Sequence, residues 1–135
     1  MNLELRNNLN AALPLRISRA AWADDVLSLG GQEWSLAVNC AWRLVGEGRL
    51  LEGWESSSAA EAAEGLVGLD VTGIGPQSEV LPADLRLQLS NHVILEMFSG
   101  HHLEPWVLSL PGVVVVASPS DKEWVEGLFG QSAAD

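Results

Sequence analysis

Apolar residues recur at every second position in several short segments of this chain, and the clearest examples are WSLAV at 34–38 and LRLQL at 85–89. Such alternation places one set of side chains on one face of a β-strand, whereas a helix needs spacings of three and four. Turn-forming pairs such as Gly30-Gly31 and Pro111-Gly112 separate the segments. The sequence therefore predicts a mainly β (α+β) protein built from antiparallel strands.

Helical signals are confined to three places. The loose apolar spacing at 3–13 allows a short N-terminal helix. The alanine-rich stretch 58–65 begins with Ser58 and Glu61 at capping-box spacing, so it forms either a short helix or a linker. A second capping box opens an apolar stripe near the end of the chain, which predicts a C-terminal helix over 121–129.

The most specific feature is a pair of similar segments. Residues 33–54 align with 84–106 after one inserted residue, and both end in Leu-Glu-x-Trp. Two copies of one strand-turn-strand-turn-strand unit, over about 15–54 and 66–117, would close a roll, sandwich or barrel, since each unit alone leaves an apolar face open. The whole chain, 1–135, has the length of one domain.

The alignment superposes Glu52 on Glu104 and Trp54 on Trp106, which makes these four residues the candidate ligand-binding site. A pseudo-twofold would bring two carboxylates near two indoles, and paired carboxylates can act as acid and base or hold a cation. Alternatively, the repeat copied a structural corner, with each tryptophan in the core and each glutamate facing water. We favour this second interpretation, because repeated residues first report shared packing, and we assign no catalytic residue.

Other chemistry-bearing patterns are weak. His101 and His102 are adjacent, so on a strand they would point to opposite faces, and we expect no metal site. Cys40 is the only cysteine, which excludes an intrachain disulfide and a thiolate zinc cluster. The sequence has no P-loop, nucleophile elbow or spaced-glycine fingerprint, so we expect no cofactor and consider an enzyme the less favoured class.

The charge of the chain limits its partners. Seven basic residues against 18 acidic ones give a net charge of -11. Nucleic-acid binding needs clustered lysine and arginine, and an anionic membrane would repel this chain, so we expect neither partner. The N-terminus lacks the apolar stretch of a signal peptide and the longest aliphatic run is too short for a membrane helix, so we expect a cytoplasmic protein.

Residues 84–98, DLRLQLSNHVILEMF, resemble a pattern of small bacterial β-rich domains of unknown function. In those domains an acidic residue opens a strand, a short turn follows, and the returning strand carries Leu-Glu-x-Phe. This chain has Asn91-His92 where those domains often have glycine. The resemblance implies a small bacterial β-rich protein and neither an activity nor a site.

Together these observations favour a non-catalytic interaction module that binds a protein partner or a second copy of itself as a homodimer. The negative charge suits a basic partner, because complementary fields speed association. One alternative is a small-molecule-binding β-roll or barrel with tryptophan and glutamate side chains lining its site. The other is a hydrolase-like enzyme that uses Glu52 and Glu104 as a carboxylate pair.

Overall fold

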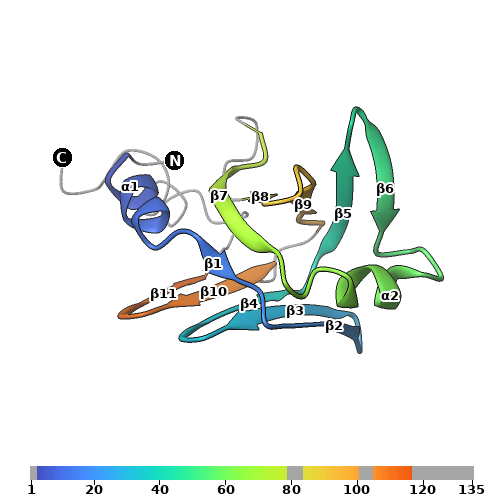
Figure 1. Ribbon diagram of the computed structural model, residues 1–135, viewed down its shortest axis with the longest axis horizontal. Helices are drawn as coiled ribbons and strands as arrows, with labels where there is room; N and C mark the ends of the chain where they lie inside the picture. Colours follow the sequence, from blue (N-terminus) through green and yellow to red (C-terminus); the bar gives the residue numbers. More distant parts are fainter. Residues whose placement is uncertain (1–2, 79–83, 101–104, 117–135) are drawn as a thin grey trace.

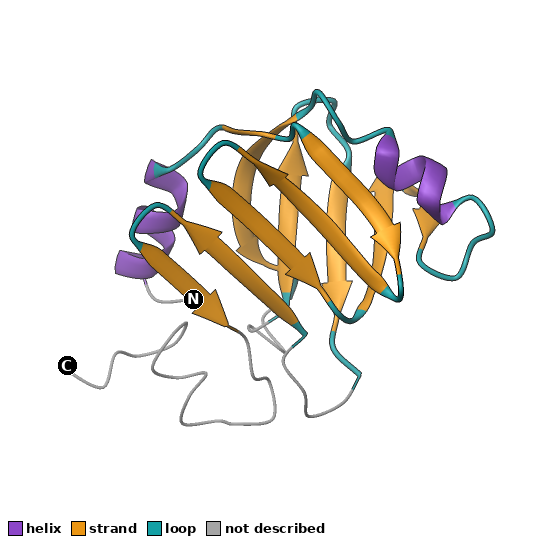
Figure 2. Ribbon diagram, turned by 90° about the horizontal axis from the view of Figure 1, so that it is seen from below, coloured by secondary structure: helices purple, strands orange, loops and turns teal. Residues whose placement is uncertain are grey.

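The computed structural model describes residues 3–78, 84–100 and 105–116, which form two antiparallel sheets and two short helices (Figure 1). One sheet has six strands in the order β1-β7-β8-β9-β5-β6: Leu15–Arg16, Asp70–Pro76, Leu85–Leu89, Ile94–Phe98, Ala41–Gly46 and Arg49–Gly53. The other has five in the order β11-β10-β4-β3-β2: Val113–Val116, Trp106–Leu110, Trp34–Val38, Val26–Gly31 and Arg19–Ala23. The prediction of a mainly β fold is confirmed, and the described strands form two facing layers and no closed barrel (Figure 2).

The helices lie at opposite ends of these layers (Figure 2). The N-terminal helix α1, Leu3–Ala11, packs against β7, and α2, Ala59–Glu64, packs against β2. The stretch 58–65 is thus a helix rather than a linker. Its predicted capping box is wrong, because Ser58 makes no side-chain cap and instead donates its hydroxyl to Glu52. The C-terminal helix predicted at 121–129 lies outside the described residues.

The core lies between the sheets and follows the alternation read from the sequence. On β4 and β8 every second residue is buried, whereas the intervening residues are partly or fully exposed. Hydrophobic side chains removed from water in this way supply most of the favourable free energy of folding. The largest fully buried side chains are Trp42, Trp106, Leu9, Ile17, Leu27, Leu29, Leu36, Leu85, Leu87, Leu89 and Leu95.

The described strands have an internal pseudo-twofold topology. Strands β2, β3 and β4 form a meander in the five-stranded sheet, and the hairpin β5-β6 that follows belongs to the six-stranded sheet. In the second set, β7, β8 and β9 form a meander in the six-stranded sheet, and the hairpin β10-β11 belongs to the five-stranded sheet. Apart from the two-residue strand β1, which has no counterpart, exchanging the two sets reproduces the strand order of both sheets, and the packing of α1 on β7 mirrors that of α2 on β2. Because each hairpin completes the other half's sheet, neither half has its own complete sheet.

The residue alignment of 33–54 with 84–106 is wrong by one strand. It superposes β4 on β8, yet β4 leads into the opposite sheet whereas β8 leads into a hairpin within its own sheet. The topology instead relates β4 to β9 and β5 to β10. The two strand pairs have corresponding registers. Trp42 of β5 pairs with Met97 of β9, and Trp106 of β10 pairs with Val38 of β4. Trp42, rather than Trp54, is therefore the structural counterpart of Trp106.

The two topological halves fall within 15–54 and 66–117. The corrected correspondence also matches residue types, because Trp-x-Leu-x-x-x-Gly occurs at 42–48 and again at 106–112. A common origin of the halves stays a prediction. The two buried tryptophans, Trp42 and Trp106, thus occupy equivalent places in the two sheets.

Candidate functional site

The strand β6 forms one end of the six-stranded sheet, and no described strand pairs with its outer edge. Its side chains are unusually apolar for so open a position: Leu50 is 64% exposed and Leu51 42%. Trp54, just after the strand, is 40% exposed. We call Leu50, Leu51 and Trp54 the β6 surface. Apolar side chains gathered at an exposed place are typical of interaction sites.

Local sequence explains how β6 is held. Glu47 and Gly48 both have positive φ, 54° and 75°, which is the backbone of a two-residue hairpin turn between β5 and β6. Farther along, the pairing shifts at Leu44/Val45, so Leu51 is an extra residue in β6. A Cβ at Gly46 would lie 3.0 Å from Leu51 Cδ1, so the missing side chain leaves room for this leucine.

A hollow of about 570 Å³ opens beside the β6 surface. Trp54, Glu52 and Phe98 are among its lining residues, together with Leu50 and Leu51. Arg43 also lines it: the guanidinium carbon lies 4.7 Å from the centre of the Phe98 ring, and Nε donates to Glu96 Oε1 at 2.7 Å. The hollow therefore combines aromatic faces with a guanidinium whose charge is already compensated.

Glu52 is committed to its own loop. Ser58 Oγ donates to Glu52 Oε2 at 2.7 Å, and the Gly53 amide donates to Oε1 at 3.4 Å. Hydrogen bonds from Ser56 and Ser58 lower the pKa of the Glu52 carboxyl, because they stabilise its charged form. A carboxylate held in this way anchors the turn that leads to α2 and is a weak proton acceptor.

Of the residues proposed from the sequence, Trp106 does not share a site with Glu52 and Trp54. Glu52 and Trp54 line the hollow, whereas Trp106 is completely buried in β10, in the other sheet. Glu104 lies outside the described residues, so its pairing with Glu52 stays a prediction. The site that the geometry supports is the part built by β6 and the turn after it.

Leu50 and Leu51 were missed by sequence reasoning. Their signal is the pair of adjacent leucines that breaks the alternation directly after the Glu47-Gly48 turn. A strand that repeats an apolar residue without alternation presents apolar side chains on both faces. Whether those faces are covered depends on the place of the strand in its sheet, which the local sequence does not specify.

A second group of titratable residues lies where the chain passes between the sheets. Asp84 is only 4% exposed, and the Ser99 amide donates to both of its carboxylate oxygens at 3.2 Å. Burial raises the pKa of Asp84 above its ordinary value. Burial also raises the pKa of the Cys40 thiol to about 11, and the nearby Asp84 charge acts in the same direction. Cys40 is thus a protonated thiol near neutral pH.

We expect Cys40 to react slowly with iodoacetamide, because only the thiolate attacks. Raising the thiol pKa from 9.0 to about 11 leaves roughly 100-fold less thiolate at pH 8 than in the unfolded chain. Labelling followed by mass spectrometry in buffer and in urea measures this ratio. Between pH 8 and pH 10 the rate in the folded protein should rise about tenfold per pH unit; a plateau below pH 9 would contradict the assignment.

Within residues 3–78, 84–100 and 105–116, no three histidine, cysteine, aspartate or glutamate side chains gather closely enough to hold a metal ion. Neither helix in these ranges has the length and apolar character to cross a membrane. Comparison of the chain with protein-family models, with curated proteins and with solved structures finds no match. The geometry of β6 and its surroundings is therefore the basis for proposing a function.

Proposed function

We propose that the chain is a non-catalytic interaction module that binds a protein partner through the β6 surface. The observation that carries this proposal is the gathering of Leu50, Leu51 and Trp54 at an open sheet edge, each 40% exposed or more. Fully burying an exposed leucine side chain is worth about 1.5–3 kcal/mol of apolar transfer free energy. Tryptophan is also among the residues that most often dominate binding energy at interfaces.

The titratable groups support a binding role rather than catalysis. The pKa of Glu52 is lowered and that of Cys40 is raised, so both shifts move the group away from neutral pH. A general base or a nucleophile works best when its pKa lies near the operating pH. Glu52 as the acid or base of a hydrolase is therefore disfavoured by its own hydrogen bonds.

Small-molecule binding is the second candidate, favoured by the aromatic lining of the hollow. Its volume of about 570 Å³ lies in the range of ligand sites. However, such sites bury most of their ligand, whereas this hollow is bounded on one side by side chains that are themselves exposed. A polypeptide that covers β6 as well as the hollow would bury more of the exposed apolar surface.

The test is affinity capture with matched variants. The tagged protein should retain a specific partner from a lysate of the native cell, and Leu50→Asp combined with Trp54→Ala should lose it. The control is Val114→Asp, since Val114 is 62% exposed on the edge strand of the other sheet. We expect at least a tenfold loss of retained partner for the double variant only, about 1.4 kcal/mol. Equal retention by all three proteins would contradict the proposal.

A further inference from the structure

We infer that the occupant of the β6 surface is an extended, basic segment of another polypeptide, which pairs with β6 as a seventh strand of the six-stranded sheet. This inference rests on the proposed function and specifies the chemistry of the partner. Strand addition uses backbone hydrogen bonds for affinity and flanking side-chain contacts for specificity. Both requirements are met by β6 and its surroundings.

The edges of the two sheets differ in length and cover. In the five-stranded sheet, α2 packs against the edge strand β2, and the other edge strand, β11, has four residues. In the six-stranded sheet, β1 at one end has only two residues, whereas β6 at the other end has five. In an antiparallel pair, alternate residues of an edge strand direct their N–H and C=O groups away from the partner strand. Among the described residues, β6 thus offers these groups over a five-residue strand that contains one bulge, at Leu51.

Apolar side chains flank the edge formed by β6. Leu50 lines two hollows, the one shared with Trp54 and another of about 460 Å³ that includes Val45 and Ile94. Arg43 lines both hollows and faces away from the core, because its neighbours Trp42 and Leu44 are buried, so both hollows open on the outer face of the sheet. Every second side chain of an added strand points to that face, so apolar residues at these positions could be buried there.

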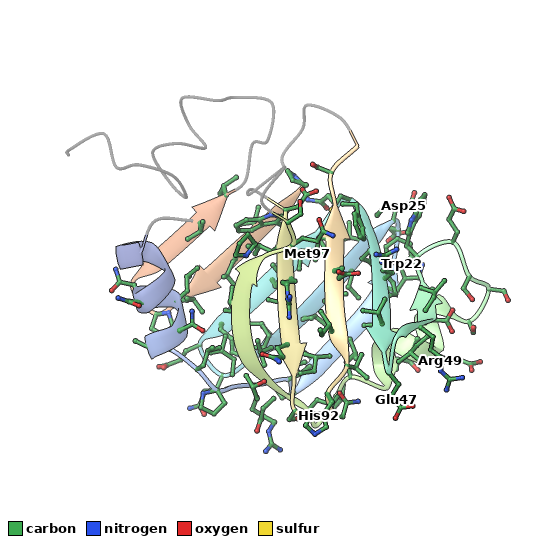
Figure 3. All side chains as sticks on the ribbon, turned by 90° about the horizontal axis from the view of Figure 1, so that it is seen from above. Trp22, Asp25, Glu47, Arg49, His92 and Met97 are labelled. Carbon is green, nitrogen blue, oxygen red and sulfur yellow. The ribbon has the colours of Figure 1, made fainter. Side chains whose placement is uncertain are left out.

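The net charge of β6 and its flanking turns is negative. From Glu47 to Glu55 the chain carries three carboxylates, those of Glu47, Glu52 and Glu55, against the single guanidinium of Arg49. Glu47 and Arg49 lie at the same end of the molecule as the tip of the β5–β6 hairpin (Figure 3). Arg43, the other cation beside the hollow, is paired with Glu96. A basic segment is attracted by this surface, whereas a second copy with the same charge of -11 is repelled.

The test uses a defined probe: an acetylated, amidated heptapeptide of alternating lysine and valine. Binding to the isotope-labelled full chain is followed by amide chemical shifts and by hydrogen exchange. We expect the largest shifts and a slowed exchange at 49–53. The control peptide is methylated on the alternate backbone nitrogens that would face β6. It keeps its charge but loses these N–H donors, so its affinity should fall at least tenfold. Equal binding of the two peptides would overturn strand addition.

Matched variants separate the β6 site from general attraction to an acidic protein. Leu50→Lys and Val114→Lys change the net charge equally, and the two side chains are 64% and 62% exposed. Only Leu50→Lys should weaken binding of the lysine–valine peptide, by at least tenfold. Equal weakening by both would show charge attraction alone and overturn the assignment to β6. Far-UV circular dichroism verifies that each variant is folded.

Two further outcomes distinguish this inference from the proposed function. If affinity capture depends on Leu50 and Trp54 but backbone methylation has no effect, the module binds proteins without adding a strand. If sedimentation shows a dimer that Leu50→Lys dissociates, the occupant of β6 is a second copy, and the basic partner is wrong. We expect a monomer at about 0.15 M salt, because the screening length of about 8 Å leaves adjacent carboxylates mutually repulsive.

Discussion

Replacing Trp106 by alanine is expected to lower the free energy of unfolding by about 3–5 kcal/mol, the range for emptying a buried aromatic site. The indole is completely buried in β10, where Trp106 is paired with Val38 of β4. Its removal leaves a cavity between sheets that the surrounding strands can fill only in part, because their backbones are fixed by pairing on both sides. For a domain of this size such a loss is a large share of the total stability.

The topology makes Trp42→Ala the companion experiment. Trp42 is also completely buried, pairs with Met97, and meets the Trp22 ring edge-on at 5.6 Å between centroids and 75° between planes. We expect a loss similar to that of Trp106→Ala. Trp54→Ala is the control, because a side chain that is 40% exposed should cost less than about 1 kcal/mol. Urea unfolding followed by circular dichroism measures all three. A loss for Trp42→Ala or Trp106→Ala as small as that expected for Trp54→Ala would contradict the assignment of these two residues to the core.

Much of the layer architecture could be predicted from local patterns. The alternation in 34–38 and 85–89 predicts which side chains are buried, because a strand with one covered face permits only one register. Turn residues such as Glu47-Gly48 predict where strands end. These features depend on residues adjacent in sequence, and therefore the sequence alone was sufficient for them.

The register of the repeat could not be predicted in the same way. Leu-Glu-x-Trp at 51–54 and 103–106 gives a convincing local match. However, Trp54 follows the edge strand β6, whereas Trp106 begins β10, which has a neighbouring strand on each side. Which sheet a strand joins is decided by long-range pairing, here by hairpins that cross to the opposite layer. A local match carries no information on that crossing, so the correct correspondence of Trp42 with Trp106 emerges only from the strand order.

Only part of the candidate site could be predicted from the sequence, because long-range strand pairing decides which residues stay uncovered. Glu52 and Trp54 come from the repeated Leu-Glu-x-Trp pattern, and both line the hollow although the alignment of that repeat is wrong. Leu50 and Leu51 are ordinary residues whose importance comes from their place on the last strand of the sheet. A leucine becomes an interaction candidate only when the fold leaves it uncovered, and that depends on every other strand in the sheet.

Gly31→Ala is also expected to lower the free energy of unfolding severely, because it disturbs a hydrogen bond between the two sheets. Trp34 Nε1 donates to the Arg16 carbonyl oxygen at 2.9 Å, and this hydrogen bond joins the five-stranded sheet to β1 of the six-stranded sheet. A Cβ at Gly31 would overlap both atoms of that bond. The carbonyl belongs to the backbone, so it yields only if β1 moves, and the nearly buried indole N–H then loses its acceptor.

The expected loss for Gly31→Ala is about 3 kcal/mol, combining overpacking with an unsatisfied buried donor. Gly75→Ala is the matched control, because Gly75 also lies in a strand, yet a Cβ there meets nothing within 4 Å. It should change stability by less than about 0.5 kcal/mol, or raise it slightly by restricting the unfolded chain. Urea unfolding of the two variants measures the difference. Equal stabilities would mean that β1 is free to shift, and that the Trp34–Arg16 hydrogen bond does not hold the two sheets together.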